Sequence, residues 1–224
     1  MALFKKLIKI RGTGNQIISK KTKTNHLYKR SCIDITGDGN LIRIHEKNDI
    51  YRVRLVVNGS HNEITFDEGL RGFFFMVVSG SNIKVHIGKN CFFRDCEMAI
   101  FENGSTLEIG EGTMSARGSK LFVSDFHTIY DIETKQPLNK GTHLKIGNHV
   151  WIGDSSIVLK NHTIADNIVV AANSVVTKDL LESNAIYAGN PAILKKRNVN
   201  WDYRYYDQYV ADLSAAGIAV ALDQ

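Results

Sequence analysis

Residues 146–176 read IGNHVWIGDSSIVLKNHTIADNIVVAANSVV, and an aliphatic residue returns at every sixth position of this stretch. The series is Ile146, Ile152, Val158, Ile164, Val170 and Val176. A period of six fits neither an amphipathic helix nor a simple alternating strand. It is typical of a three-sided coil in which each side is one short strand with one inward aliphatic residue. Three sides then make a turn of 18 residues, so that Ile146 is expected to stack on Ile164, and Ile152 on Val170.

Small residues follow most of the inward aliphatic positions, where a larger side chain would crowd the bend between two sides. They are Gly147, Gly153, Ala165 and Ala171, with Gly88 and Gly110 earlier in the chain.

The first half of the chain has a longer repeat of the same kind. Four segments close on Ile44, Phe66, Ile87 and Ile109, which are separated by 22, 21 and 22 positions. We interpret each as one turn with a few extra residues at one corner. Asn58-Gly59, Ser79-Gly80 and Asn103-Gly104 supply the backbone conformations that a tight corner needs.

Two segments depart from the repeat. Residues 124–142 are polar and contain Pro137, and we predict that they form an exposed loop, where functional residues tend to lie. After Arg197 the repeat stops. Trp201 and four tyrosines, at positions 203, 205, 206 and 209, follow within nine positions. We expect a short helix near 207–216 to cap the open end of the coil, which would otherwise expose unpaired strand edges; a sugar-stacking aromatic platform is the alternative.

Composition places few further limits on function. Of 224 residues, 43% are hydrophobic and 23% are charged, as in a globular domain, and we find no apolar run of the roughly 20 residues that a membrane span needs. We therefore expect a cytoplasmic protein without a membrane span and without nucleic acid as a partner. Cys32, Cys91 and Cys96 suggest neither a disulfide framework nor a zinc site.

The net charge is +5, and the N-terminal segment 1–30 is rich in lysine and arginine. We interpret this segment as a solvated basic face, with weak association with an anionic membrane surface or attraction to a phosphorylated substrate as alternatives.

The motifs at 146–153, 164–178 and 187–192 resemble the hexapeptide-repeat acyltransferases, within them the sugar and polysaccharide O-acetyltransferases. The resemblance implies an all-β fold, a left-handed parallel β-helix over residues 31–197, with an exposed loop at about 124–142 and a C-terminal helical cap in segment 198–224. It also implies a homotrimer with each active site between two neighbouring copies. The loop Ser124-Asp-Phe-His-Thr-Ile-Tyr-Asp131 is similar to that of enzymes that acetylate capsular or lipopolysaccharide sugars.

The resemblance assigns catalysis to the loop. Removing a proton from an attacking hydroxyl requires a base that is neutral near pH 7, and histidine suits this role. The resemblance places this role on His127, with Asp125 or a backbone carbonyl fixing the imidazole tautomer. Direct transfer without an acyl-enzyme is expected, because no Ser or Cys lies in a nucleophile motif. Trp151 and Tyr130 are implied to contact the carbohydrate acceptor, although Trp151 could instead pack against a neighbouring subunit.

The same resemblance implies acetyl-CoA as the acyl donor, with no metal. Small or polar residues that would let the pantetheine arm approach the coil are Gly153, Ala172, Thr177 and Lys178. Lys195, Lys196 and Arg197 could meet the phosphates, or could form a solvated basic segment.

The sequence leaves three other functions as alternatives. A zinc site like that of the γ-type carbonic anhydrases would need three histidines to meet, and the spacing of His143, His149 and His162 argues against it. The solenoid could also serve as a scaffold without catalysis. Among enzymes, the alternative is acetylation of a small acceptor such as serine, a free sugar, a nucleotide amino sugar or an antibiotic.

Overall fold

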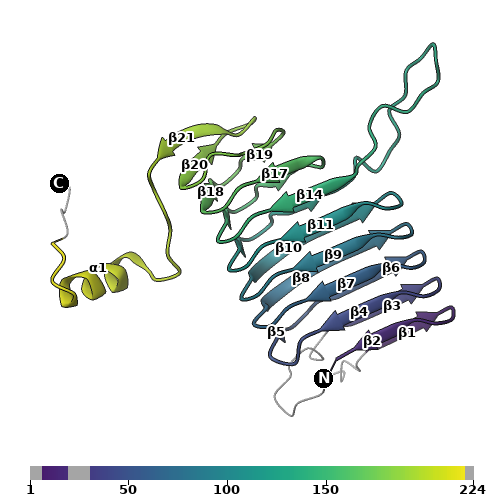
Figure 1. Cartoon of the computed structure of the whole chain (residues 1–224), viewed down its shortest axis with the longest axis horizontal. Coiled ribbons are helices and arrows are strands. Elements are labelled where there is room, and N and C mark those ends of the chain that lie inside the picture. The colour runs from purple at the N-terminus through teal and green to yellow at the C-terminus, as the bar shows by residue number, and fades with distance from the viewer. Residues whose placement is uncertain (1–6, 20–30, 220–224) are drawn as a thin grey trace, which may run out of the picture.

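The computed structural model describes residues 7–19 and 31–219. They form a parallel β-solenoid followed by one short helix, α1 (Tyr206–Ala215) (Figure 1). The predicted all-β solenoid, the exposed loop and the C-terminal helix are therefore confirmed.

Each turn of the solenoid has three faces, which the chain visits in order. The first face contains β1 (Leu7–Arg11), β3 (Cys32–Thr36), β6 (Arg54–Asn58), β13 (Lys120–Phe122), β16 (Ile157–Val158) and β19 (Val175–Val176). The second face contains β2 (Gln16–Ile18), β4 (Leu41–Ile44), β7 (Glu63–Phe66), β9 (Lys84–Ile87), β11 (Thr106–Ile109), β14 (His143–Ile146) and β17 (His162–Ile164). The third face contains β5 (Asp49–Ile50), β12 (Met114–Ser115), β15 (Trp151–Ile152), β18 (Ile168–Val170), β20 (Ala185–Ala188) and β21 (Ile193–Arg197).

Two long strands connect the third face to the first. β8 (Arg71–Ser79) and β10 (Phe92–Phe101) continue around the corner between these faces, so that both faces belong to one 14-stranded sheet. The second face is a separate sheet of seven strands.

Inward side chains stack in columns, as the six-residue period predicts. Ile146 pairs with Ile164 and Ile152 with Val170, and all four side chains are buried. The earlier column, made by Ile44, Phe66, Ile87 and Ile109, continues directly into Ile146. Burial of these aliphatic columns supplies the main stabilisation of the solenoid, at roughly 25 cal/mol per Å² of apolar surface removed from water.

The corners explain the polar residues of the hexads. The third residue after each inward aliphatic has a left-handed backbone, with φ between 53° and 63° at His149, Ser155, Asn161, Asn167 and Asn173. Asparagine tolerates this conformation better than most residues. A Cβ on Gly153 would lie 2.5 Å from the Ala172 nitrogen. The requirement for small residues at the bends is therefore confirmed.

The long spacing between Ile109 and Ile146 has the predicted cause. These two residues pair directly across β11 and β14, although 37 positions separate them. Residues 124–142 therefore leave the solenoid between β13 and β14 and return within one turn.

The N-terminal boundary predicted at residue 31 differs from the structure. β1 pairs with β3, and β2 with β4, so the solenoid already includes residues 7–18. Arg11 forms an ion pair with Asp34, at 2.6 Å between Nη1 and Oδ1. Other basic residues of this segment, Lys5, Lys6, Lys20, Lys21, Lys23, Lys29 and Arg30, lie outside the described residues.

The predicted helix exists, but its predicted position over the end of the coil is wrong. Figure 1 shows α1 projecting from one side of the solenoid, and none of its residues is buried. The last edge is instead paired by β21, which runs antiparallel to β20. No helix in the described ranges is both long and apolar enough to cross a bilayer.

Candidate active site

The loop that carries the predicted catalytic residues is a projecting hairpin. It leaves at the corner between the first and second faces, which we call the loop corner, and extends away from the solenoid (Figure 1). The Leu138 amide donates to the Ile129 carbonyl at 2.8 Å, and the Asp131 amide donates to the Gln136 carbonyl at 2.9 Å. The Asp131 carboxylate accepts from the Thr134 amide at 2.7 Å and closes the tip. The loop therefore has a defined shape.

His127 lies near the base of this hairpin and is exposed. Its amide donates to the Asp125 carbonyl at 2.7 Å. Its imidazole makes no hydrogen bond to any other residue that the structure describes. The ring is therefore available to a ligand.

The residue before His127 is held in an unusual backbone conformation. Phe126 has φ of 65°, a left-handed value that costs a non-glycine residue roughly 1–2 kcal/mol. Its ring packs edge-on against Phe101 and Phe122, with centroids 5.2 and 5.1 Å away. Strained backbone of this kind clusters at functional sites and persists only where the surroundings enforce it.

Asp125 does not contact the His127 ring, although it was predicted as one of two groups that could orient it. Its Oδ2 instead accepts from the Lys160 ammonium and from the Asn139 amide, each at 2.8 Å. Partial burial raises the pKa of this carboxyl, but the hydrogen bonds from Lys160 and Asn139 outweigh burial, and the pKa lies below its ordinary value. Asp125 is therefore an ionised group at the base of the loop.

Three more predicted site residues lie at the loop corner or in the hairpin itself. Thr177 and Lys178 follow β19 at the loop corner and are exposed; Lys178 is 18 positions after Lys160. Tyr130 lies further out in the hairpin, is 55% exposed, and has the Lys135 ammonium 5.6 Å from its ring centroid. All three predicted residues are accessible to a ligand from solvent.

Trp151 belongs to a different part of the solenoid. It is the outward residue of β15 in a column on the third face that runs Arg71, Phe92, Met114, Trp151. This column borders a cavity of about 740 Å³. Trp151 is 37% exposed and forms part of the cavity wall.

The cavity carries several arginines. Arg71, Arg94 and Arg117 line it, together with Asp154. Arg204 also lines it, but Asp202 and Asp212 neutralise this guanidinium by ion pairs. The cavity therefore combines an aromatic surface with excess positive charge.

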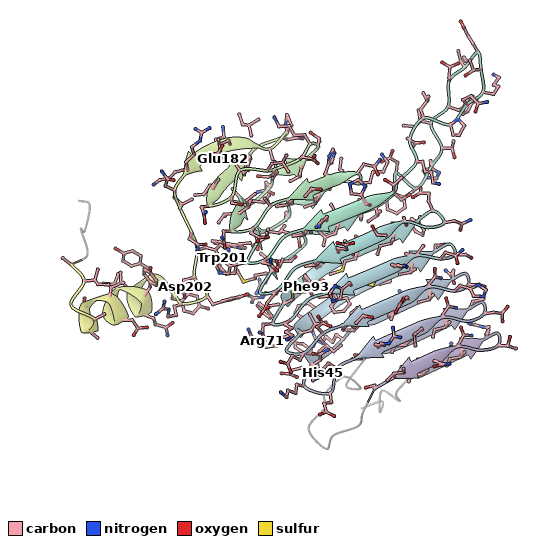
Figure 2. All side chains as sticks on the ribbon, in the orientation of Figure 1. His45, Arg71, Phe93, Glu182, Trp201 and Asp202 are labelled. Atoms are coloured by element: carbon pink, nitrogen blue, oxygen red, sulfur yellow. The ribbon has the colours of Figure 1, made fainter. Side chains whose placement is uncertain are left out.

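The segment after the last strand forms the remaining wall of the cavity. The Trp201 indole donates to the His149 carbonyl at 2.8 Å, and the Tyr203 hydroxyl donates to the Gly112 carbonyl. Burial raises the pKa of Tyr203 to about 12. This wall was missed from the sequence, where the aromatic segment was assigned to the end of the coil. Figure 2 shows Trp201, Asp202 and Arg71 on the same side of the solenoid.

The remaining predicted donor-binding residues lie away from the loop corner. Gly153 and Ala172 are at the corner between the third and first faces, after β15 and β18. Lys195, Lys196 and Arg197 are exposed on β21. The Arg197 guanidinium is engaged by Glu182. Only the two lysines of this group are without an ion pair among the described residues.

The three histidines weighed as a zinc site do not come together. His143 and His162 lie in β14 and β17 of the second face, while His149 lies at the next corner under Trp201. Within residues 7–19 and 31–219 no group of three potential ligands gathers around one point.

The predicted catalytic residue and the predicted acceptor wall therefore lie in two separate places on one chain. The hairpin with His127 leaves from one side of the solenoid, and the cavity segment around Trp201 lies on the other side (Figures 1 and 2). One copy alone does not bring His127 to Trp151.

Two crystal structures share this architecture over nearly their whole length. The polySia-specific acetyltransferase NeuO matches with a TM-score of 0.82 and 24% sequence identity, covering 92% of this chain and 97% of that chain. The polysialic acid O-acetyltransferase OatWY matches with a TM-score of 0.82 and 24% identity, covering 95% of this chain and 100% of that chain. This chain has the fold of the polysialic acid O-acetyltransferases.

Comparisons with family models and with curated proteins find no relative of this chain. No protein-family model matches the chain, and no curated protein matches it. A maltose O-acetyltransferase from Clostridium difficile is 33% identical but covers 54% of this chain and 60% of that chain, with a TM-score of 0.42.

Proposed function

We propose that this chain transfers an acetyl group from acetyl-CoA to a hydroxyl of a sugar in a surface polysaccharide, of a capsule or a lipopolysaccharide. The observation that carries the proposal is the exposed His127 imidazole on an anchored hairpin, in a solenoid with the fold of two polysialic acid O-acetyltransferases. We place the reaction in the cytoplasm.

His127 acts as the general base. Its imidazole takes the proton of the sugar hydroxyl as the oxygen attacks the thioester carbonyl. The new C–O bond forms, the C–S bond breaks, and the imidazolium returns its proton to the departing coenzyme A thiolate. The exposed ring, without a hydrogen bond to any described residue, suits a group that must contact both substrates.

The cysteines support direct transfer without an acyl-enzyme. Burial raises the pKa of Cys91 to about 12 and that of Cys96 to about 11. Both thiols are therefore neutral near pH 7, and a neutral thiol is a weak nucleophile. Cys32 lies in β3, outside the loop and the cavity.

The donor is held by groups from both parts of the site. Thr177 and Lys178 lie exposed at the loop corner, and Ala172, exposed at the corner between the third and first faces, leaves little side chain in the path of a pantetheine arm. Gly153 is buried at that corner, where it packs against the Ala172 amide of the next turn. Exposed Lys195 and Lys196 attract the phosphates. Arg197 contributes less, because Glu182 holds its guanidinium.

The acceptor binds in the cavity. Trp151 offers an aromatic surface for a sugar ring, and Arg71, Arg94 and Arg117 favour a sugar that carries a carboxylate. Sialic acid, the acceptor named for both structural neighbours, has such a group. An acidic polysaccharide is therefore the preferred acceptor.

A complete site requires two copies, because His127 and Trp151 lie on different sides of one solenoid. We infer a homotrimer, in which the hairpin of one copy reaches the cavity of the next. Cyclic symmetry makes each such contact equivalent.

The proposal is tested by measuring acetyl-CoA turnover against a panel of acceptors. The panel contains acidic and neutral polysaccharides, and small acceptors including serine, free sugars and nucleotide amino sugars. We expect turnover with an acidic polysaccharide, reduced at least about a hundredfold in His127→Ala while the fold is retained. Unchanged turnover in His127→Ala would remove the assigned base.

The same panel separates the alternatives. Turnover confined to a small acceptor would replace the polysaccharide assignment. A chain that neither turns over any acceptor nor binds coenzyme A in calorimetry would be a scaffold.

A further inference from the structure

Lys160 is a lysine with little exposed surface at the base of the hairpin. It follows β16 at the loop corner, in the first turn after the loop, and only 16% of its side chain is exposed. Its ammonium lies 2.8 Å from Asp125 Oδ2. A lysine is seldom buried to this extent unless its charge is paired.

Asn139, on the returning arm of the hairpin, joins this pair to the backbone around His127. Its side-chain amide donates to Asp125 Oδ2 at 2.8 Å and to the His127 carbonyl at 2.9 Å. Its side-chain oxygen accepts from the Ile129 amide at 2.8 Å. One asparagine therefore ties both arms of the hairpin together on either side of His127.

The turn before the loop also contacts the base of the hairpin, residues 124–127 and 139, which we call the stem. The Ser124 hydroxyl donates to Glu102 Oε1 at 2.8 Å and accepts from the Phe126 amide at 2.9 Å. Glu102 belongs to the preceding turn and Lys160 to the following turn. The outgoing arm is thus fixed from two neighbouring turns, and Lys160 is the one cation in that arrangement among the described residues.

We propose that Lys160 is a positioning residue, which holds His127 in its reactive place through Asp125 and Asn139; the catalytic part of this inference rests on the proposed function. Asp125 accordingly serves as an anchor of the stem rather than as a partner of the imidazole. The hairpin projects away from the solenoid (Figure 1), so the contacts at its base, this anchor among them, decide where the ring lies.

Magnitudes favour a positioning role over a contribution to overall stability. A solvent-exposed ion pair contributes little to stability. Asp125 is 31% exposed and Lys160 16%, so this pair is stronger than a surface pair, yet it lies outside the aliphatic columns. A misplacement of about 1 Å, by contrast, can cost about a hundredfold in rate.

The experiment compares Lys160→Met with the full-length wild type by two independent readouts. Hydrogen exchange of peptides covering 125–139 reports on the stem whether or not the protein turns over a substrate. Steady-state kinetics with acetyl-CoA and an acidic polysaccharide as acceptor reports on the placement of His127. Lys145→Met is the matched control, because Lys145 also lies near a carboxylate, that of Glu108 at 3.9 Å, but belongs to β14 of the second face and not to the network of Lys160, Asp125 and Asn139.

We expect Lys160→Met to raise exchange of the stem about tenfold or more, and to lower kcat about 10- to 100-fold with an unchanged KM for acetyl-CoA. Lys160→Arg keeps the charge, so its stem exchange and its kcat should be close to those of the wild type. The double variant Lys160→Met with Asp125→Asn should be no worse than either single variant, because both remove the same contact. Lys145→Met should match the wild type in each readout.

Each contrary outcome has a separate meaning. Unchanged exchange in Lys160→Met would overturn the anchor itself. Faster exchange with an unchanged kcat would overturn the positioning role. If Lys160→Met fails to fold, Asp125→Asn alone must show the same faster exchange, or the inference is wrong. A wild type without turnover would overturn the proposed function, and with it the catalytic role of Lys160, while exchange still decides the anchor.

Discussion

The indole of Trp201 lies parallel to the imidazole of His149, with ring centroids 4.3 Å apart and an angle of 6° between the planes. The same indole donates its N–H to the His149 carbonyl at 2.8 Å. Stacking and hydrogen bond together fix the segment after β21 along the third face. This segment forms one wall of the cavity that Trp151 borders.

Replacing Trp201 by Ala should release this segment without unfolding the solenoid. Trp201 is 9% exposed, and its indole packs against the rings of His149 and Trp151. We expect trypsin to cleave after Arg204 several times faster in Trp201→Ala, while the thermal unfolding of the solenoid stays close to that of the wild type. Trp201→Phe keeps the stack and loses the N–H, and should show an intermediate rate. Equal cleavage in all three proteins would show that other contacts hold the wall.

Two inactive variants should restore each other if the site is shared between copies. His127→Ala removes the proposed base and Trp151→Ala removes the proposed acceptor wall. His127 lies in the hairpin at the loop corner, and Trp151 lies in β15 of the third face. Co-expressed in equal amounts, they should assemble sites of which about a quarter have both residues intact. Turnover would be measured on the mixture and on each variant alone. A mixture with no more turnover than the separate variants would place both residues in one copy.

Arg94→Gln should weaken the binding of an acidic acceptor in particular. Arg94 lines the cavity and is exposed. Losing one charge-assisted hydrogen bond should raise KM for an acidic polysaccharide about tenfold, and leave KM for acetyl-CoA unchanged. Arg54→Gln is the matched control, because Arg54 lies over the Phe75 ring on the first face, outside the cavity. An equal rise in KM for a neutral acceptor would contradict recognition of the carboxylate.

Phe93→Ala should destabilise the solenoid strongly. Phe93 is 0% exposed and packs edge-on against Phe74, with centroids 5.8 Å apart. Truncating a buried phenylalanine costs about 3–5 kcal/mol, which urea denaturation would measure. Ile132→Ala, at a position 77% exposed in the hairpin, should change the free energy of unfolding by less than about 0.5 kcal/mol. A small loss of unfolding free energy in Phe93→Ala would mean that neighbouring turns collapse into the cavity left by the phenyl ring.

The buried thiols predict a pH dependence. Burial raises the pKa of Cys91 to about 12 and that of Cys96 to about 11, above the ordinary value of 9.0. The folded state therefore binds these protons more tightly than the unfolded chain, and stability should fall as the pH rises above about 9. At pH 8, iodoacetamide should modify half-buried Cys32 first, and Cys91 and Cys96 only after unfolding. Mass spectrometry would identify the modified residue, and rapid native labelling of Cys96 would contradict its burial.

The sequence predicted those features that repeat along the chain. Ile146, Ile152 and Val158 each stack on a residue 18 positions later, so periodicity alone located the inward side chains. The first turn was missed because its spacing is irregular: Ile10 pairs with Ile35 across 25 positions, and no neighbouring turn has this length.

The parts of the site that escaped prediction depend on contacts without a period. Trp201 contacts His149 across 52 positions, a distance unrelated to any turn, so the aromatic segment was assigned to the wrong place. Lys160 reaches Asp125 across a loop whose path the repeat does not define. His127 could be recognised because the loop motif resembles a known family, but the partners of Asp125 required coordinates.

The antiparallel strand β21 limits where further turns can be added to the solenoid. Because β21 runs antiparallel to β20, it ends the parallel ladder of the third face, and another rung cannot be appended beyond it in the same register. We therefore expect a whole turn to be inserted or lost between the first turn and β11, ahead of the hairpin, rather than after β20. Such changes would lengthen or shorten the solenoid at its N-terminal end. The distances within the hairpin and the turns that follow it would stay the same.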